Sequence, residues 1–252
     1  MELALEDKIV VVTGASGTIG QAVCKAFLAE KAYVTAIYKS NVQAIEKLQD
    51  RAQEEQTTKN FHAVQADITG AHTAENIIDE ILERHGRIDV LVNAAGITFE
   101  NLFLMTEDED WEKLWNTNFT ATMKICREVL RPMMRRNSGS IINISSVLAG
   151  KYGRGAIAYA VSKSAIERFT QTLALETGKK GIRVNAVAPG IVESEMAMQV
   201  ISSMGNKLLE NTPLNRYGKA DEIAQTVLFL ASENASSFIT GQVLHVDGGL
   251  SV

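Results

Sequence analysis

Short runs of β-branched residues alternate with longer helix-forming segments along the whole chain of 252 residues. The runs IVVV, IDVLV and SIINIS carry no regular polar alternation, which is typical of strands covered on both faces. Strands that alternate with helices form βαβ units, and successive units build a parallel sheet with helices on both sides. We therefore predict an α/β fold, a Rossmann-like, doubly wound, seven-stranded parallel sheet.

The expected elements cover most of the chain. Strands are expected at residues 8–13, 33–38, 61–65, 88–92, 140–145, 182–187 and 243–246. Helices are expected near residues 18–30, 41–55, 73–85, 107–135, 158–178 and 220–231. Because no linker or low-complexity tract interrupts this alternation, residues 1–252 are expected to form one domain.

Composition argues against several classes of protein. A net charge of −5 is unlike a general nucleic-acid binder, and no run of 18 apolar residues could form a membrane span. The start, MELALEDKIV, carries acids where a signal peptide needs a basic segment. With only Cys24 and Cys126, a disulfide framework is not expected, and we place the protein in the reducing cytoplasm. The four histidines share no metal-ligand spacing, so no metal site is expected.

The segment KIVVVTGASGTIG, residues 8–20, places glycines at positions 14, 17 and 20. A buried strand, a glycine loop and a helix can form a dinucleotide phosphate site, because a helix N-terminus offers unpaired N–H groups and a positive dipole end. Gly14 would allow the sharp turn, and Gly20 would let the helix pack closely on the strand. Glycines at this spacing also occur in a plain tight turn, and the loop alone leaves that alternative open.

Further motifs follow this loop in a defined order. They are NAAG at 93–96, NTN at 116–118, Ser146, YAVSK at 159–163 and PG at 189–190. Together with TGASGTIG, this series resembles the short-chain dehydrogenase/reductase family from about residue 5 to the C-terminus. Within it, SIINISS, IRVNAVAPGIVESEM and ITGQVLHVDGG are most similar to the β-ketoacyl-carrier-protein reductases.

The glycine loop departs from the family pattern at two positions. Thr18 stands where the family has glycine, and Gly17 stands where NADPH-dependent reductases often have arginine. Thr18 could offer its hydroxyl to a phosphate or cap the helix. The loop is still interpreted as a phosphate cradle.

The resemblance implies four catalytic residues, Asn118, Ser146, Tyr159 and Lys163. Tyr159 and Lys163 are four residues apart and share one face of a helix, although such pairs also occur on ordinary helix surfaces. By the resemblance, Tyr159 donates a proton to the substrate oxygen, while the Lys163 ammonium lowers the phenol pKa and holds the nicotinamide ribose. Ser146 would polarise the substrate carbonyl. Asn118 would hold a relay water, and it could also kink its helix through backbone bonds.

A nicotinamide cofactor is implied, with NADP(H) favoured over NAD(H). NAD-selective folds place a carboxylate at the end of the second strand, but this chain reads AIYKSN there, where Lys39 and Ser40 could meet a 2′-phosphate. Asp67 resembles an adenine-contacting aspartate, and it could equally cap the following turn. The residues expected at the cofactor are Gly14, Ser16, Gly17, Thr18, Ile19, Gly20, Lys39, Ser40, Asp67, Ile68, Asn93, Ala94, Gly96, Tyr159, Lys163, Pro189, Gly190, Ile191 and Ser194.

The expected function is NADPH-dependent reduction of a 3-oxoacyl thioester, linked to acyl-carrier protein or coenzyme A, to the 3-hydroxyacyl thioester. One alternative is an NAD(P)-dependent dehydrogenase or reductase of another alcohol–ketone pair, such as a sugar, steroid or xenobiotic carbonyl. A second alternative, from another class, is a cofactor-sensing binding protein without turnover. The intact set of Ser146, Tyr159 and Lys163 argues against the second alternative.

The resemblance also implies partners. An acidic carrier protein would dock on basic residues near Arg136 and Lys180, and the methionine-containing segment 195–217 would form a lid over an acyl chain. A homotetramer is expected, with helices 107–135 and 158–178 at one interface and the C-terminal VLHVDGGLSV at another.

Overall fold

The computed structural model describes residues 2–151, 153–194 and 207–252 of the chain. Within these residues, seven parallel strands form one sheet in the order β3-β2-β1-β4-β5-β6-β7. The strands are β1 (Ile9–Thr13), β2 (Tyr33–Tyr38), β3 (Phe61–Gln65), β4 (Val90–Asn93), β5 (Gly139–Ile144), β6 (Ile182–Pro189) and β7 (Val243–Val246). The predicted seven-stranded, doubly wound parallel sheet is confirmed.

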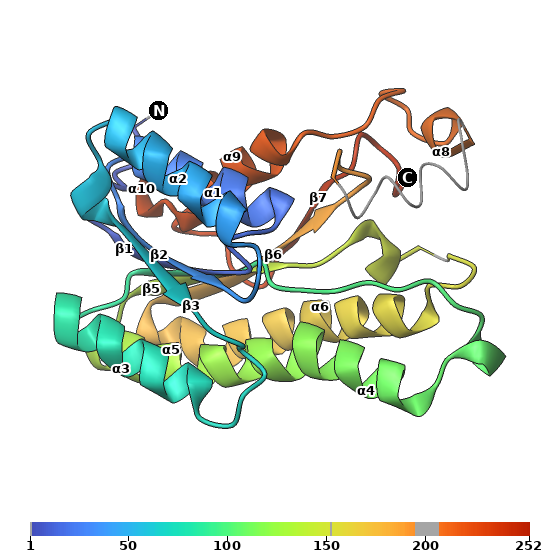
Figure 1. Cartoon of the computed structure of the whole chain (residues 1–252), viewed down its shortest axis with the longest axis horizontal. Helices are drawn as coiled ribbons and strands as arrows, with labels where there is room; N and C mark the ends of the chain where they lie inside the picture. Colours follow the sequence, from blue (N-terminus) through green and yellow to red (C-terminus); the bar gives the residue numbers. More distant parts are fainter. Residues whose placement is uncertain (1, 152, 195–206) are drawn as a thin grey trace.

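Helices cover both faces of this sheet, so that the molecule has three layers (Figure 1). The upper layer in that view contains α1 (Thr18–Ala29), α2 (Val42–Glu54) and α9 (Ala220–Ala231). The lower layer contains α3 (Thr73–His85), α5 (Ala121–Arg136) and α6 (Ile157–Thr177). Shorter helical segments are α4 (Asp108–Trp115), α8 (Lys207–Glu210), α10 (Glu233–Ser236), η1 (Thr58–Asn60), η2 (Phe103–Met105), η3 (Asn116–Thr120), η4 (Val147–Ala149) and η5 (Gly178–Lys180).

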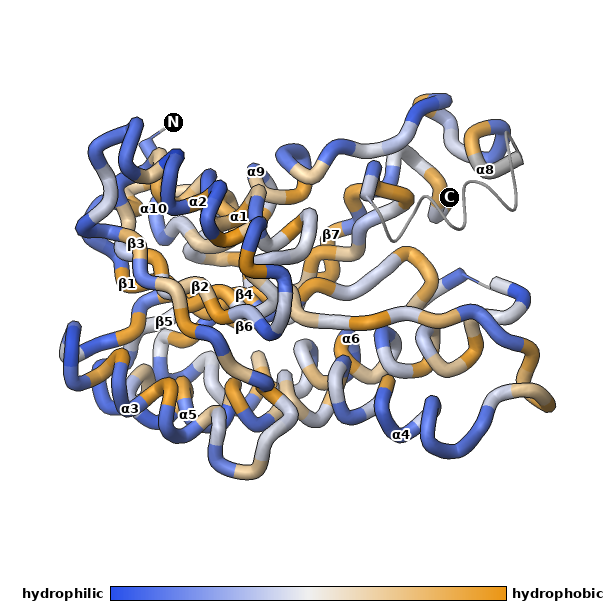
Figure 2. Tube along the Cα trace, viewed as in Figure 1, coloured by the Kyte–Doolittle hydropathy of each residue, from blue (hydrophilic) through white to orange (hydrophobic). Residues whose placement is uncertain are grey.

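Alternate residues of each strand point to opposite layers, which explains the continuous apolar runs in the sequence. In β1, Val10 and Val12 join the core against α1, α2 and α9, whereas Ile9 and Val11 join the core against α3, α5 and α6. Figure 2 shows hydrophobic residues concentrated along the strands and hydrophilic residues on the outer sides of the helices. A parallel sheet buried on both faces needs apolar side chains in both directions.

The strand order reverses between β1 and β4. From β1 the chain winds outward through β2 to β3, then crosses back to β4 on the other side of β1. The loops after β1 and β4 therefore frame a crevice at the carboxyl edge of the sheet, where doubly wound folds bind ligands. A Cβ added at Gly14 would lie 2.6 Å from Cα of Ala95, so the two loops touch at this point.

One predicted helix is interrupted. In place of a continuous helix over 107–135, the structure has α4, a π-helical turn η3 (Asn116–Thr120) and α5. The side chain of Asn118, at the centre of this turn, bonds to Ile97 in the loop after β4. Turns of this kind often occur at functional sites, and apolar periodicity does not reveal them.

Two further observations bear on the expectations from the sequence. Among the described helices, none is both long and apolar enough to cross a membrane. The predicted lid at 195–217 lies largely outside the described residues, which resume at residue 207. Met196, Met198 and Met204, the residues expected to form an apolar wall, lie outside the described residues.

Candidate active site

The loop between β1 and α1 is a tight turn that is stabilised by local hydrogen bonds. The N–H of Gly17 donates to the carbonyl of Gly14 over 3.0 Å, and the Gln21 side chain donates to the carbonyl of Ser16 over 3.0 Å. Gly14 has a φ of +65°, a left-handed conformation that favours glycine. The loop therefore presents its backbone at the carboxyl edge of the sheet, as a phosphate cradle requires.

Gly20 lies against the start of the same loop. A Cβ at Gly20 would lie 2.1 Å from the carbonyl oxygen of Gly14 and 2.9 Å from Cα of Ala15. Glycine thus allows α1 to pack closely on the strand, with its first turn aimed at the crevice. No side-chain hydrogen bond caps α1, so N–H groups of its first turn remain for an anionic ligand. The residues present fit a dinucleotide pyrophosphate.

Thr18 does not cap this helix. Gly17 occupies the N-cap position with extended backbone angles, and Thr18 is the first helical residue. The capping role considered for Thr18 is therefore wrong, because a cap must precede the first helical turn. Thr18 instead lies in the first turn of α1, which faces the crevice.

Replacement of Gly20 by Ala is expected to weaken NADPH binding about tenfold and to lower the free energy of unfolding by about 1–3 kcal/mol. The added methyl group would overlap the Gly14 carbonyl, so α1 would have to move away from β1. Fluorescence titration with NADPH measures the first effect, and urea denaturation measures the second. Gly178→Ala is the matched control, since a Cβ there meets nothing within 4 Å. Equal effects of the two substitutions would contradict the close-packing argument.

Two of the candidate cofactor residues pair with each other at the ends of β2 and β3. The ammonium of Lys39 lies 2.6 Å from the carboxylate of Asp67. Asp67 also accepts hydrogen bonds from the backbone and hydroxyl of Thr69, so the expected turn-capping role is confirmed. The hydrogen bond from Lys39 is the largest cause that lowers the pKa of Asp67 to about 2, and Asp67 is ionised at neutral pH. Ser40 beside this pair is exposed, and Ile68 is buried.

The side-chain amide of Asn93 donates hydrogen bonds to other buried residues. Its amide donates to the side-chain oxygen of Asn143 over 2.9 Å and to the sulfur of Cys126 over 3.3 Å. The Asn143 amide donates in turn to the hydroxyl of Thr170 over 2.8 Å, which ties β4 and β5 to α6. Both bonds of Asn93 use its amide donors, while its side-chain oxygen is buried without a hydrogen-bond partner among the described residues.

Ser146 and Tyr159 meet where β5 ends and α6 begins. Ser146 follows β5 and is 9% exposed. Its hydroxyl oxygen accepts a hydrogen bond from the N–H of Leu148 over 3.2 Å, and the Tyr159 hydroxyl lies next to it. The strand end and the first turn of the helix thus bring two hydroxyls together at the carboxyl edge of the sheet.

Lys163 lies one helical turn beyond Tyr159 and is 5% exposed. Its Nζ donates to the carbonyl of Ile144 over 2.8 Å and lies 5.7 Å from the centre of the Tyr159 ring. A Cβ added at Gly96 would lie 3.4 Å from this Nζ, so the loop after β4 passes directly over the ammonium. The structure therefore brings Ser146, Tyr159 and Lys163 into one cluster.

Burial governs the ionisation of this cluster. Burial raises the pKa of Tyr159, although the neighbouring Ser146 hydroxyl acts in the opposite direction. Burial also lowers the pKa of Lys163 to about 8. The net shift at Tyr159 is thus opposite to the lowering expected from Lys163, because desolvation of the phenolate dominates. Tyr159 is therefore a neutral phenol at neutral pH, the form that can donate a proton.

Asn118 connects the π-helical turn to the loop after β4 and to α6. Its side-chain oxygen accepts from the N–H of Ile97 over 2.8 Å, and its amide donates to the Ile97 carbonyl and the Ser162 hydroxyl, each over 3.0 Å. The Ser162 hydroxyl donates onward to the backbone carbonyl of Tyr159 over 2.7 Å. Both donor positions of the amide are thus occupied by protein groups, and a relay water could use only a remaining oxygen lone pair.

Sequence reasoning missed Ser162 and Gln21. Ser162 lies inside the quoted YAVSK motif, but its partner Asn118 is 44 positions away along the chain. Gln21 follows the last glycine of the loop and reaches back to the Ser16 carbonyl. Serine and glutamine are common helix residues, and no local pattern marks them as bridges. Only the placement of the loop against the helix reveals both roles.

The segment after β6 closes the opposite side of the crevice. Pro189 ends β6, and a Cβ at Gly190 would lie 2.7 Å from Cα of Asp247 in the C-terminal segment. The carbonyl of Ile191 accepts a hydrogen bond from the N–H of Gly218 over 2.9 Å. These contacts hold the chain from Pro189 to Ser194 at the same edge of the sheet as Ser146, Tyr159 and Lys163.

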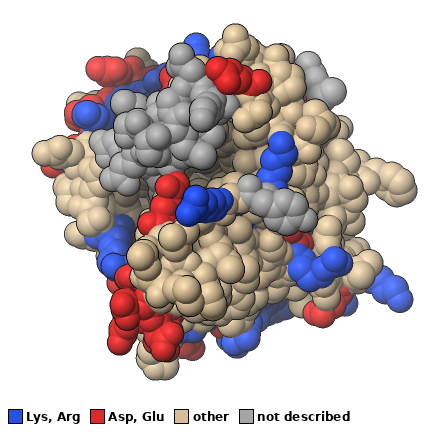
Figure 3. All heavy atoms as spheres, turned by 90° about the vertical axis from the view of Figure 1, so that its right-hand side faces the viewer, with Lys and Arg blue, Asp and Glu red and all other residues tan. Residues whose placement is uncertain are grey.

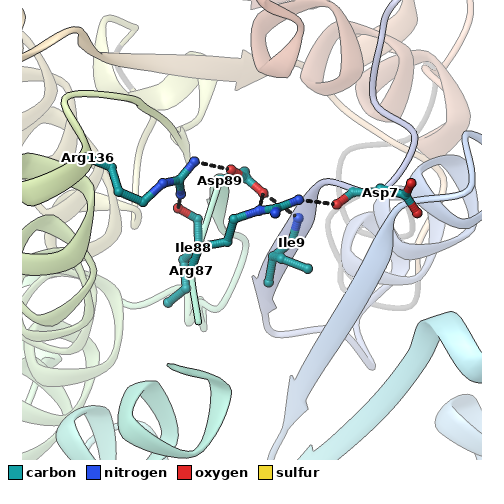
Figure 4. A network of polar contacts seen from close by, with 6 residues as sticks. All are labelled: Asp7, Ile9, Arg87, Ile88, Asp89 and Arg136. Carbon is teal, nitrogen blue, oxygen red and sulfur yellow. Dashed lines mark hydrogen bonds and ion pairs between the residues drawn. The ribbon is translucent and has the colours of Figure 1, made fainter. Parts of the chain in front are cut away.

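The predicted carrier-docking residues lie at the other edge of the sheet. Arg136 ends α5, and its guanidinium donates to Asp89 over 2.8 Å and to the carbonyl of Ile88 over 3.1 Å (Figure 4). Lys180 precedes β6 and is exposed. From Tyr159 to the end of α6 the helix spans about 27 Å, at roughly 1.5 Å per residue. Within one chain, these residues are therefore remote from the cluster of Ser146, Tyr159 and Lys163, and Arg136 belongs to an internal network.

The carboxyl-edge side of the molecule carries few charges. Figure 3 shows this side, which is the right-hand side of Figure 1, with Lys and Arg scattered among Asp, Glu and uncharged residues. The described residues visible there form no continuous basic surface. The turn η2 at this end exposes Phe103, Leu104 and Met105. The side nearest the cluster is thus mainly uncharged.

The chain is similar to known proteins over nearly its whole length. A family profile described as enoyl-(acyl carrier protein) reductase matches residues 14–251. The chain is 37% identical over 253 residues to the 3-oxoacyl-[acyl-carrier-protein] reductase of Thermotoga maritima, covering 99% of this chain and 100% of that protein. It is 36% identical over 247 residues to the 3-oxoacyl-[acyl-carrier-protein] reductase of Escherichia coli K12, with coverage of 97% and 98%. The solved structure of ElxO with NADP bound matches with a TM-score of 0.88 at 32% identity, covering 97% of this chain and 98% of that chain.

Proposed function

Because the chain belongs to the short-chain dehydrogenase/reductase family, we propose that it reduces the 3-oxo group of an acyl thioester to a 3-hydroxyl group with NADPH. The observation that carries this proposal is the cluster of Ser146, Tyr159 and Lys163 beside a glycine loop shaped for a pyrophosphate. The curated relatives are named 3-oxoacyl-[acyl-carrier-protein] reductases and match nearly the whole chain. The cluster supports the chemistry, and the relatives support the substrate class.

The proposed cofactor-binding residues divide along the carboxyl edge of the sheet. Residues 14–20 would hold the pyrophosphate, and Lys39, Ser40, Asp67 and Ile68 would hold the adenosine half. The nicotinamide half would be held by Asn93, Ala94, Gly96, Tyr159, Lys163, Pro189, Gly190, Ile191 and Ser194. When bound, the nicotinamide supplies the hydride. The Lys39 side chain and the lack of a carboxylate directly after β2 support NADP(H), as does the NADP bound to ElxO.

The residues of the cluster have distinct proposed roles. Tyr159, kept protonated by its raised pKa, donates a proton to the oxygen that becomes the 3-hydroxyl. Ser146 donates a hydrogen bond to the same oxygen and stabilises the negative charge that develops on it. Lys163, whose pKa is about 8, provides a positive charge one turn away that stabilises the phenolate left by proton transfer. Asn118 positions Tyr159 through Ser162.

The cluster favours a carbonyl substrate over an alkene, although the family profile is described by an enoyl reductase. The hydroxyls of Ser146 and Tyr159 converge, and a carbonyl oxygen can accept two hydrogen bonds through its two lone pairs. In a 3-oxo thioester this oxygen is on the carbon that receives the hydride, whereas in an enoyl thioester the carbonyl oxygen is on the thioester carbon, two carbons from the one that receives the hydride. The donor set therefore suits reduction at a C=O bond.

We also propose an acidic acyl-carrier protein as partner, a homotetramer as the assembly and the cytoplasm as the compartment. Arg135 and Lys180 remain exposed for a carrier, whereas Arg136 is engaged with Asp89. Because these residues lie at the edge opposite Tyr159, a carrier bound there would serve the site of a neighbouring subunit. The two free, buried cysteines suit a reducing compartment.

A thioester assay tests the proposal directly. The purified protein is mixed with NADPH or NADH and with acetoacetyl-coenzyme A, and oxidation of the cofactor is followed by absorbance. Crotonyl-coenzyme A serves as the enoyl comparison, and the acetoacetyl carrier-protein thioester tests the partner. We expect turnover of the oxo thioester with NADPH, and faster turnover of the crotonyl thioester would overturn the proposed reaction. Cofactor binding without turnover of either thioester would direct the search to another alcohol–ketone pair.

A further inference from the structure

An ion pair occupies the corner where a doubly wound fold recognises the ribose 2′-position of a dinucleotide. Lys39 Nζ lies 2.6 Å from Asp67 Oδ2, which joins the chain after β2 to the chain after β3. Residues just after the second strand distinguish a 2′-hydroxyl from a 2′-phosphate in such folds. The cation expected to bind the phosphate is thus already paired within the protein.

The side chains of Lys39 and Asp67 differ in how firmly the protein holds them. Asp67 Oδ1 accepts hydrogen bonds from the N–H of Thr69 over 3.0 Å and from its hydroxyl over 2.7 Å. The Gln65 side chain donates to the backbone carbonyl of Lys39 over 3.1 Å, so the backbones of the two strand ends are linked. The Lys39 side chain is 68% exposed, against 43% for Asp67. The carboxylate is therefore a fixed feature of this corner, whereas the lysine side chain can rotate.

From this arrangement we infer that Asp67 is a cofactor-specificity residue, which competes with a 2′-phosphate for Lys39 and so limits the preference for NADP(H) over NAD(H). The inference rests on the proposed use of a nicotinamide cofactor. A phosphate monoester carries a charge of about −1.5 to −2 at neutral pH. A 2′-phosphate that binds Lys39 would therefore lie beside the Asp67 carboxylate, which is also negatively charged. A 2′-hydroxyl is uncharged and can donate a hydrogen bond to that carboxylate. Asp67 thus opposes one cofactor and tolerates the other.

The competition is moderate in strength. Exposed ion pairs are weak because water screens both charges, so a phosphate can displace the carboxylate from Lys39. The displaced carboxylate stays close, since Thr69 holds it in place. Lys39 and Asp67 therefore set the cofactor preference together, and neither residue type alone predicts it.

Binding constants for the two cofactors test this inference. Dissociation constants for NADPH and NADH are measured by fluorescence titration of the full chain, for the wild type, Asp67→Asn, Lys39→Ala and the double variant. Asparagine keeps a side-chain oxygen for Thr69 and removes only the charge. We expect the NADPH-to-NADH affinity ratio to rise about 3- to 10-fold in Asp67→Asn and to fall about tenfold in Lys39→Ala. In the Lys39→Ala background, Asp67→Asn is expected to change the ratio by a smaller factor.

The outcomes separate this inference from the proposed function. An unchanged ratio in Asp67→Asn, with both cofactors still bound, would overturn the inference and leave the reductase proposal intact. A wild-type preference for NADH would refute the proposed cofactor, while a raised ratio in Asp67→Asn would still support the role of Asp67. Failure of the wild type to bind either cofactor would overturn both. Glu6→Gln is the matched control, because it removes the charge from the exposed Lys31–Glu6 pair, and no change in the ratio is expected.

Discussion

Replacement of Tyr159 by Phe is expected to lower kcat/KM for reduction of a 3-oxoacyl thioester by about 10³-fold. The phenol is the proton donor in the proposed reaction, and its hydroxyl lies beside that of Ser146 at the end of β5. Phenylalanine keeps the ring that lies 5.7 Å from Lys163 Nζ and removes only the oxygen. The loss is therefore expected in the chemical step, measured as kcat with saturating NADPH and acetoacetyl thioester.

The comparison needs a tyrosine that lies away from the crevice. Tyr33 begins β2 at the amino edge of the sheet, where its ring packs against His85, and Tyr33→Phe is expected to retain activity. The dissociation constant of NADPH should change little in Tyr159→Phe, because most of the proposed cofactor contacts remain. A loss of activity below about tenfold would remove Tyr159 from the role of essential proton donor.

Replacement of Asp89 by Ala is expected to lower the free energy of unfolding by about 3 kcal/mol or more. Asp89 is 7% exposed and accepts hydrogen bonds from the N–H of Ile9 over 2.8 Å, from Arg87 over 3.0 Å and from Arg136 over 2.8 Å (Figure 4). The carboxylate thus joins β1, β4 and the end of α5. Its removal leaves two guanidinium groups and a backbone donor without this acceptor. Urea denaturation at neutral pH measures the change.

An exposed ion pair provides the control for this measurement. Arg51 and Glu55 form such a pair across one turn of a helix end, and Glu55→Ala is expected to cost less than about 0.5 kcal/mol. A loss in Asp89→Ala as small as that in Glu55→Ala would contradict a structural role for the network.

The stability gap between wild type and Asp89→Ala should also depend on pH. Burial tends to raise the pKa of Asp89, but the hydrogen bonds from Ile9, Arg136 and Arg87 outweigh it and hold the pKa below its usual value. The contribution of Asp89 is therefore complete above the usual carboxyl range and is lost as the pH falls through the folded pKa. The gap is expected to narrow in that acidic range.

Most of the fold was predictable because its signals are local. β2, β3 and β7 have the predicted bounds, and the other strands differ by one or two residues at their ends. The strand predicted to begin at residue 88 begins at Val90, because Asp89 turns its carboxylate toward Ile9. The kink considered for Asn118 is confirmed as η3, but its partner Ile97 lies in a distant loop that the sequence did not indicate.

The candidate site was predictable in its residue types and less so in their interactions. The motif order identified Ser146, Tyr159 and Lys163, and the structure places them in one cluster. The sequence did not indicate that Lys163 donates to Ile144, or that burial raises the pKa of Tyr159. Desolvation depends on everything packed around a group, and a motif does not contain that information.

By itself, the sequence determined the kind and order of the elements and the chemical groups at the carboxyl edge of the sheet. The elements follow from apolar periodicity and glycine conformation, which act over a few residues, and the chemical groups follow from the resemblance of the ordered motifs to the family. Only the tertiary structure decided which polar groups pair: Lys39 with Asp67, Arg136 with Asp89, and Asn118 with Ser162. The physical reason is that hydrogen bonds and ion pairs form between groups brought within about 3 Å, whatever their separation along the chain.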